Sequence, residues 1–535
     1  MRDAMPNLSA AKVLDHTQEL LEKQLPGCGC HPEQRRDCGR LNTGQSHAIE
    51  EVTNNRDGGY PAMQIVLEIP EELKGVGEAI KTMVHQVEAT WRSTQGGRAV
   101  EYAAIEQQLA AGAAAIERAS HQVVLQGLDM DHPQVVIAGQ VYSRVGRYEA
   151  SYYTLAGPVP VTRTLYREQG ARNAKTVNAV SLRCGVVGEG WLPRTAQAMA
   201  HQLQHGTSRE AEQTAQILGR LPYARSSFES VGQEVGRQYT AVRTVLEEVL
   251  MEEYVVPAEV ASVSVALDRV SVPMEEAVAA AERAAQPKGH KRKVWRQFRM
   301  AYCATLTLHD HTGEALQTLR YGRMPQGDVA ELCETLAEDV RTLLRKRPGL
   351  RVILLADGAP ELWKLLTGSL NAQTVGVPVR QLVDLWHLLE KLGSAARLLY
   401  GETHGSAVLH TWRLRLLNRS GSVAEILQEL RNSGKAEVAV GTSRPVHEAI
   451  TYLENHQARM NYAAARRHGL PVGSGNVEAT CKSLVAVRMK RPGARWKEET
   501  GEHLLNLRAL ALSDRWEPAM TLTFRPLRKA IRLAA

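Results

Sequence analysis

The chain has 535 residues, 44% of them apolar and 23% charged, which is enough for several globular domains with cores of their own. Its net charge of +7 favours a polyanionic partner, although the excess is modest for this length. No run of about 18 apolar residues and no signal-peptide pattern occurs, and the seven cysteines are scattered, so we expect a cytoplasmic protein rather than a membrane-spanning or secreted one.

Residues 1–60 are predicted to form an N-terminal arm around one cluster of residues that commonly bind metals. The cluster consists of Cys28, Cys30, His31 and Cys38. Cysteine and histidine suit zinc, yet their spacing differs from the two paired knuckles of a zinc ribbon. Two interpretations stay open, a structural zinc site and a loosely packed arm without metal, and the second is preferred.

Two predicted modules follow this arm. Residues 61–130 place apolar residues three and four positions apart, which predicts a helical region with two paired helices. Residues 131–190 are rich in Val, Tyr and Thr and alternate well enough to predict a small sheet over 135–166. Arginines and tyrosines interleave along that sheet, so one of its faces could contact DNA or could be a solvated surface.

Residues 191–254 are predicted to be helical, with a short Gly and Pro break between two amphipathic segments. This arrangement is typical of a helix-turn-helix, whose second helix enters the major groove of DNA. That second helix is predicted over 225–237, and its terminal residues Arg225 and Arg237 are candidate DNA contacts. Because short helix pairs are common, a role as scaffold stays open.

Acidic residues then accompany two predicted strands. The buried strand Val263–Val272 contains the single acid Asp268, and two further strands after it complete a meander. The very apolar strand Arg351–Ala356 runs directly into Asp357. Open sheets of mixed α and β structure bind ligands at the carboxyl ends of their strands, so both acids are candidate site residues.

A further strand and a late helix supply the remaining candidates. The strand ends near Asp384, and the helix that follows it carries His387. Residues 391–464 are predicted to form a helical insertion. After it, Glu478 is the one acid in the basic stretch LPVGSGNVEATCKSLVAVRMKRPGARW, where a Gly-Ser-Gly turn leads into a predicted helix.

Basic residues near these acids are candidate contacts for DNA phosphates, although a basic run is also typical of a solvated loop. The candidates are Lys291, Arg292, Lys293, Arg296, Lys482, Arg488, Lys490 and Arg491. Residues 516–535 are expected to be a C-terminal tail.

The order of predicted elements, with acids at Asp268, Asp357 and Glu478, resembles the ribonuclease H-like core of DDE transposases and retroviral-type integrases. The segment from Asp384 to His387 is similar to the Cys/Asp-x-x-His motif of Mutator-like transposases. The stretch around Glu478 looks like the end of the catalytic domain in bacterial insertion-sequence transposases of the Kra type.

This resemblance covers residues 255–512 well and the N-terminal half only loosely. It departs from the family pattern at Arg269, where a glycine commonly follows the first acid. The implied fold class is α+β and multidomain. A ribonuclease H-like mixed α/β core over 255–390 and 465–515 would be interrupted by the helical insertion and preceded by helical and small β-sheet modules.

The implied function is that of a transposase that binds transposon ends and catalyses two-metal-ion phosphodiester cleavage and strand transfer. Asp268, Asp357 and Glu478 would bind two Mg²⁺ ions, for which Mn²⁺ substitutes, while Asp384 and His387 would orient the site or the DNA. The expected partners are double-stranded DNA at the ends and target and at least one further copy of the chain, in the bacterial nucleoid and without a membrane. Two alternatives stay open, a domesticated DNA-binding protein and a metal-dependent nuclease without strand transfer.

Overall fold

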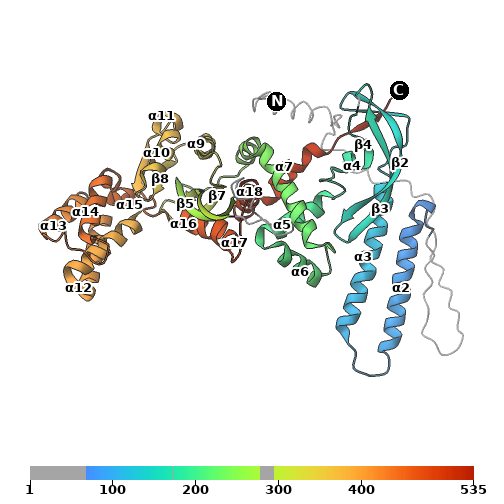
Figure 1. The fold of residues 1–535 in the computed structure, drawn as a ribbon, viewed down its shortest axis with the longest axis horizontal. Helices are drawn as coiled ribbons and strands as arrows, with labels where there is room; N and C mark the ends of the chain where they lie inside the picture. Colours follow the sequence, from blue (N-terminus) through green and yellow to red (C-terminus); the bar gives the residue numbers. More distant parts are fainter. Residues whose placement is uncertain (1–67, 172, 277–294, 535) are drawn as a thin grey trace, which may run out of the picture. The chain divides into compact units, whose positions relative to one another are not determined.

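The computed structural model of the chain describes residues 68–171, 173–276 and 295–534, and divides the chain into the units Met1–Thr82 and Met83–Ala535 (Figure 1). Several candidate residues lie outside the described residues. These are Cys28, Cys30, His31, Cys38, Lys291, Arg292 and Lys293. Within the described ranges, no helix combines the length and the apolar character needed to cross a membrane.

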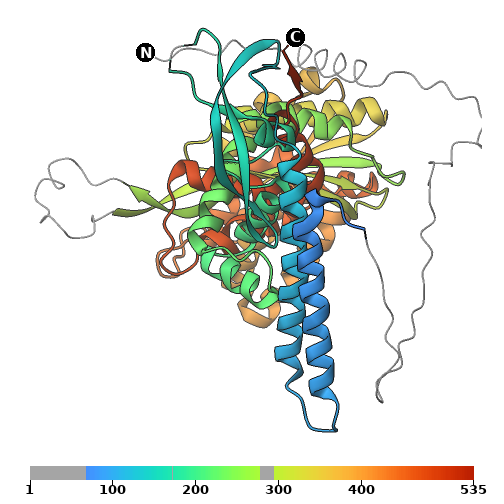
Figure 2. The same cartoon turned by 90° about the vertical axis from the view of Figure 1, so that its right-hand side faces the viewer.

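Two long helices precede the first sheet. They are α2 (Lys74–Thr94), after the short 3₁₀ turn η1 (Glu71–Leu73), and α3 (Tyr102–Gln126). The part of α2 from residue 83 onward packs along α3 (Figure 2), where Gly112 leaves room for the sulfur of Met83. Leu125, near the end of α3, is buried against the first sheet together with Tyr152 and Val159.

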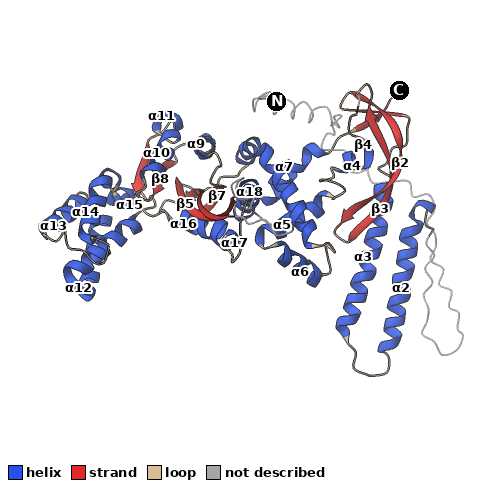
Figure 3. Ribbon diagram, in the orientation of Figure 1, coloured by secondary structure: helices blue, strands red, loops and turns tan. Residues whose placement is uncertain are grey.

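The first sheet has five strands in the order β10-β1-β2-β3-β4, drawn in red in Figure 3. Its strands are β1 (Gln134–Ile137), β2 (Gln140–Thr154), β3 (Gly157–Glu168), β4 (Val177–Asn178) and β10 (Ile531–Leu533). Residues alternate between buried and exposed along the start of β3, as expected for a sheet that covers a core on one face. The last strand pairs antiparallel with β1, so the end of the chain belongs to this sheet, unlike the expected tail.

Helices of the N-terminal half share a core with the C-terminal end of the chain. The N-terminal helices are α4 (Ala179–Cys184), α5 (Pro193–His205), α6 (Ser208–Leu218) and α7 (Arg225–Glu252), and the C-terminal ones are α18 (Glu498–Leu512) and α19 (Trp516–Phe524), followed by η4 (Arg525–Leu527). Phe228 and Val235 of α7 are buried in one cluster with Leu507, Trp516 and Met520. The module expected at 191–254 therefore has no separate core in this structure.

The second sheet has the order β7-β6-β5-β8-β9. Its strands are β5 (Ser262–Glu276), β6 (Trp295–His309), β7 (Ala315–Arg323), β8 (Arg351–Ala356) and β9 (Val379–Val383). The first three pair antiparallel as a meander, and β8 and β9 add in parallel. Five of the six residues of β8 are buried, which explains its continuous apolar sequence. The expectation of a multidomain fold of mixed α and β structure is confirmed.

Helices surround this sheet and form the insertion. Next to the sheet are α9 (Val329–Lys346), α10 (Pro360–Ser369) and α11 (Ala372–Val375), and the insertion is formed by α12 (Leu385–Asn418), α13 (Ser422–Asn432), α14 (Pro445–His456), η2 (Gln457–Arg459) and α15 (Tyr462–Arg467). The chain returns to the sheet through α16 (Gly475–Thr480), the π-helical turn η3 (Cys481–Ala486) and α17 (Val487–Met489). Within α12, Gly401 has a φ of 75° and interrupts the helix.

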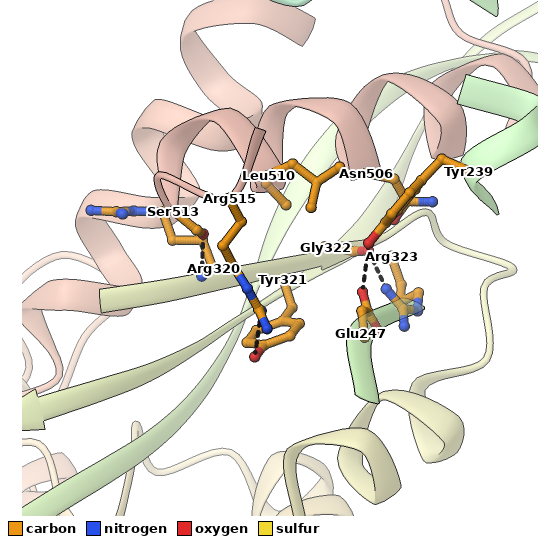
Figure 4. A pocket seen from close by; sticks show the side chains of 11 residues that line it. Tyr239, Glu247, Arg320, Tyr321, Gly322, Arg323, Asn506, Leu510, Ser513 and Arg515 are labelled. Atoms are coloured by element: carbon orange, nitrogen blue, oxygen red, sulfur yellow. Dashed lines mark hydrogen bonds between the residues drawn. The ribbon is translucent and has the colours of Figure 1, made fainter. Parts of the chain in front are cut away.

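A buried cluster of charged and phenolic side chains from α7, β7 and Arg515, the residue before α19, lies beside α18 (Figure 4). Arg323, Glu247 and Arg515 are less than a tenth exposed, and Arg515 donates to the hydroxyl of Tyr321 over 3.4 Å. That hydroxyl donates in turn to Asp339, whose pKa is raised to about 7 by burial, against the opposing charge of Arg515. The neutral form of Asp339 is therefore favoured by folding.

We expect Asp339→Asn to change how the stability of the protein depends on pH. Because the pKa of Asp339 is higher in the folded state, its protonation stabilises the fold at low pH. This contribution is lost as pH rises from the ordinary aspartate pKa of 3.8 to about 7. We therefore expect the difference in melting temperature, unaltered chain minus Asp339→Asn, to decrease as pH rises from 3.8 to about 7. Circular dichroism measures both melting temperatures. Glu334→Gln, an exposed change on the same helix, is the control. A difference between the two chains that stays constant with pH would contradict the role of Asp339.

Candidate active site

Three acids lie on or just after neighbouring strands of the second sheet. The parallel pairing of β5 with β8 ends at Ala266 and Leu355, two residues before Asp268 and Asp357. The pairing of β8 with β9 ends at Ala356 and Val383, and the amide of Asp384 donates to the carbonyl of Ala356 over 3.0 Å. Neighbouring strands are about 4.8 Å apart, so the backbones that carry these acids run close to one another.

Glu478 reaches the same place from α16. Its carboxylate lies 3.4 Å from Nε2 of His387, and its side chain is 47% exposed. One turn further along the helix, the thiol of Cys481 donates to Asp268 over 3.5 Å. Residues three apart on a helix share one face, so Glu478 and Cys481 both face the acids of the sheet.

The charges of neighbouring acids act on Glu478. Burial raises the pKa of Glu478, His387 lowers it, and the negative charges of Asp384 and Asp268 raise it again, with a net rise. Glu478 is connected to these acids through its neighbours, because His387 binds Glu478 and Cys481 donates to Asp268. The structure thus brings Glu478 together with acids that are far from it in the sequence.

Asp384 is fully buried and is the most extensively hydrogen-bonded of these acids. One of its oxygens accepts from the backbone amides of Trp386 and His387, over 2.5 and 3.1 Å, and so caps the start of α12. The other accepts from the backbone amide of Ser474 and, over 2.7 Å, from its hydroxyl. Asp384 therefore fixes the loop before α16 to the helix that carries His387.

The residues around Asp357 and Asp268 are tied to α10. Asp357 accepts from the amide of Ala359 over 2.8 Å, and its carbonyl accepts from the indole of Trp363 over 2.7 Å. Arg269, at the position where the family pattern has glycine, forms an ion pair with Glu361 in the first turn of α10. The departure from the pattern thus links the strand of Asp268 to the helix after Asp357.

The donor chemistry of Asp268, Asp357 and Glu478 fits a hard divalent cation, because carboxylate oxygens are the ligands that Mg²⁺ prefers. In the described residues, however, no group of three or more His, Cys, Asp or Glu side chains is arranged so that it could hold a metal ion. Glu478 contacts His387 and Asp268 contacts Cys481. The structure supplies the expected type of ligand without a complete ligand shell.

The basic residues after Glu478 differ in their surroundings. Lys482 and Lys490 are exposed, as a DNA contact requires. Arg488 is only 6% exposed, and its guanidinium lies 5.1 Å from the ring of Trp496. Its position inside the core leaves it unable to reach a phosphate in this structure, unlike the expectation. Arg491 forms an ion pair with Glu210 over 2.5 Å and is partly exposed.

The expected recognition helix is part of a longer core helix. It is the first half of α7, whose Gly236 packs against His503 of α18 and whose Gln233 hydrogen-bonds to that histidine over 2.9 Å. Arg225 is exposed, and Arg237 is exposed and paired with Glu234. In addition, the backbone of Arg296 in β6 pairs with that of Glu275. Arg225 and Arg237 thus lie on α7 and not on the strands and helices that carry the acids.

Sequence reasoning missed several neighbours of the acids. They are Ser474, Cys481, Tyr452 and His456, of which the last two face Gly358, the residue after Asp357. Cys481 follows Glu478 by three residues, and this helical spacing was the available signal. No comparable signal marks Tyr452 and His456, because they come from the insertion.

Comparison with known proteins gives distant structural matches only. No family model and no curated protein matches the sequence. A Drosophila P element transposase strand transfer complex matches with a TM-score of 0.24 and 12% identity, covering 63% of this chain and 81% of that one. A Mos1 transposase paired-end complex with left transposon end has a TM-score of 0.15 and 16% identity, covering 52% and 77%. A Mos1 mariner paired-end complex with Mn matches with a TM-score of 0.14 and 16% identity, covering 51% of this chain and 78% of that one. The similarity is to transposase structures and is remote.

We expect Asp384→Ala to destabilise the fold strongly. It leaves the amides of Trp386, His387 and Ser474 without their acceptor in a buried place, which should lower the free energy of unfolding by at least about 3 kcal/mol. The control is Asp328→Ala, which removes a helix cap at the exposed start of α9 and should cost about 1 kcal/mol. Urea unfolding measures both values. Equal losses would show that the bonds to Ser474 contribute little.

Proposed function

We propose that the chain is a DDE-type DNA transposase of an insertion sequence, with Asp268, Asp357 and Glu478 as its catalytic acids. The observation that carries this proposal is that Cys481, three residues after Glu478, donates to Asp268 of β5, while Asp357 directly follows β8, the parallel neighbour of β5. The strand of the first acid pairs in parallel with the strand that ends just before the second. Burial is the main cause of the raised pKa of Glu478, and the charges of Asp384 and Asp268 add to it.

The topology of the second sheet supports a ribonuclease H-like core. Three antiparallel strands are followed by two parallel ones in the order β7-β6-β5-β8-β9. In this proposal the acids lie on and beside the central strands, where their side chains face α16 rather than the core. The insertion then enters after β9 and returns before α16, so it does not interrupt the sheet.

This site suits chemistry on a phosphodiester. Cleavage by water, and joining of a 3′ hydroxyl to a second phosphodiester, both require stabilisation of oxygens that gain negative charge. Two Mg²⁺ ions held by Asp268, Asp357 and Glu478, with Mn²⁺ as a substitute, would supply that stabilisation and lower the pKa of bound water. Asp384 keeps the Glu478 loop in place, and the imidazole of His387 holds the Glu478 carboxylate over the sheet.

Double-stranded DNA is the proposed substrate, at transposon ends and at the target. The net charge of +7 favours such a partner, and Lys482 and Lys490 are exposed on the segment that carries Glu478. Arg225 and Arg237 and the N-terminal modules are proposed to bind the ends. We further propose that at least two copies act together on DNA, in the bacterial cytoplasm and nucleoid.

A donor plasmid with the DNA that flanks the coding sequence tests the activity. With Mg²⁺, the unaltered chain should give both cleaved and joined products. Asp268→Ala, Asp357→Ala and Glu478→Ala should each lower cleavage at least about 100-fold, because the three residues act as one unit, while DNA binding is retained. Glu402→Ala, an exposed acid of α12, should cleave normally.

The other outcomes of this assay separate the alternatives. Cleavage without joined products would indicate a metal-dependent nuclease. Specific DNA binding without any cleavage would indicate a domesticated DNA-binding protein. Undiminished cleavage after one of the three changes would remove that residue from the site.

A further inference from the structure

The insertion contacts the turn that carries Asp357. Gly358 has no side chain, and a Cβ atom at this position would lie 2.6 Å from Cε2 of Tyr452 and 2.9 Å from Nε2 of His456. Both distances are shorter than van der Waals contact. Tyr452 and His456 are four residues apart on α14, so one face of that helix presents both rings to the turn.

The two rings are held in place mainly by packing. Their centroids are 4.8 Å apart, and His456 is only 8% exposed. The hydroxyl of Tyr452 and Nδ1 of His456 are buried without a hydrogen-bond partner among the described residues. The contact with Gly358 therefore depends on the shape of the rings rather than on hydrogen bonds from these atoms.

A second contact from the same part of the insertion supports the same turn. Arg459, just after α14, lies 4.5 Å from the ring of Trp363 and donates to Gln381 of β9 over 2.9 Å. Trp363 is the residue whose indole binds the carbonyl of Asp357. The insertion thus contacts the Asp357 turn directly through Gly358 and indirectly through Trp363.

We infer that Tyr452 and His456 are positioning residues, through which the docked insertion fixes the Asp357 carboxylate. The inference rests on the proposed function in so far as Asp357 is a catalytic acid. In this arrangement the insertion belongs to the active site, since Asp357 keeps its place only while α14 lies against Gly358. Glycine is needed there for space, and the aromatic ring of Tyr452 fills that space.

Two substitutions in the full-length chain test the contact. Gly358→Ala pushes the turn away from α14, and Tyr452→Ala removes the ring that supports it. Each should increase amide exchange around Asp357 by about tenfold or more, since local opening becomes easier. Each should also weaken Mn²⁺ binding by about tenfold, measured by paramagnetic resonance of the free ion, because the ligand loses its support.

Three matched variants serve as controls. Gly368→Ala changes a glycine of the neighbouring helix α10 that has open space around it, and Tyr400→Ala removes an exposed tyrosine of the insertion. Tyr452→Phe keeps the ring and removes only the hydroxyl that has no partner, so it should behave as the unaltered chain in exchange and in Mn²⁺ binding. Normal exchange and Mn²⁺ binding in Tyr452→Phe but not in Tyr452→Ala would show that the ring acts by packing and not through a hydrogen bond of its hydroxyl.

Cleavage kinetics complete the test. Gly358→Ala and Tyr452→Ala should lower the cleavage rate by about 10- to 100-fold, as expected for a misplaced catalytic group, with unchanged DNA affinity. Normal exchange and normal Mn²⁺ binding in both variants would overturn the inference even if Asp357→Ala abolishes cleavage. An inactive unaltered chain would overturn the proposed function, while amide exchange would still report on the contact. If Gly358→Ala fails to fold, the comparison of Tyr452→Ala with Tyr452→Phe decides alone.

Discussion

The arrangement of the candidate site depends on the buried carboxylate of Asp384, which accepts from the start of α12 and from Ser474. Removing a carboxylate from water is costly, and here charge-assisted bonds from backbone amides offset that cost. The same bonds fix where the insertion leaves the sheet and where it returns. Its two ends therefore meet at one residue, which allows a long insertion without displacement of Glu478 from the acids of the sheet.

The strands and their acids could be predicted from the sequence because their signals are local. The strand predicted at Arg351–Ala356 is β8 with the same bounds, and the apolar strand containing Asp268 lies within β5. The placement of Asp268 relative to Asp357 depends on the pairing of β5 with β8, whose register the sequence leaves open. The sequence also could not predict which basic residues are buried. Arg488 lies in a basic segment typical of a DNA contact, yet in the structure it packs on Trp496 and donates to the carbonyl of Leu203 in the core.

Longer-range packing explains the remaining differences. The Gly and Pro break before α7 and the helical pattern through residue 254 were visible, but nothing in the pattern shows that α7 packs on α18. A strand of three residues such as β10 is too short for periodicity to reveal. The contact of Tyr452 with Gly358 likewise joins segments that are distant in sequence, and only the folded chain brings them together.

The pairing of β10 with β1 has a consequence for biosynthesis. Residues 531–533 are translated nearly four hundred residues after the strand that they cover. Domains generally fold from the N-terminus while the ribosome is still working, yet here the outer edge of an early sheet stays uncovered until synthesis of these residues. The nascent chain thus exposes an unpaired strand edge for most of its elongation, which makes it a natural client for chaperones that bind extended segments.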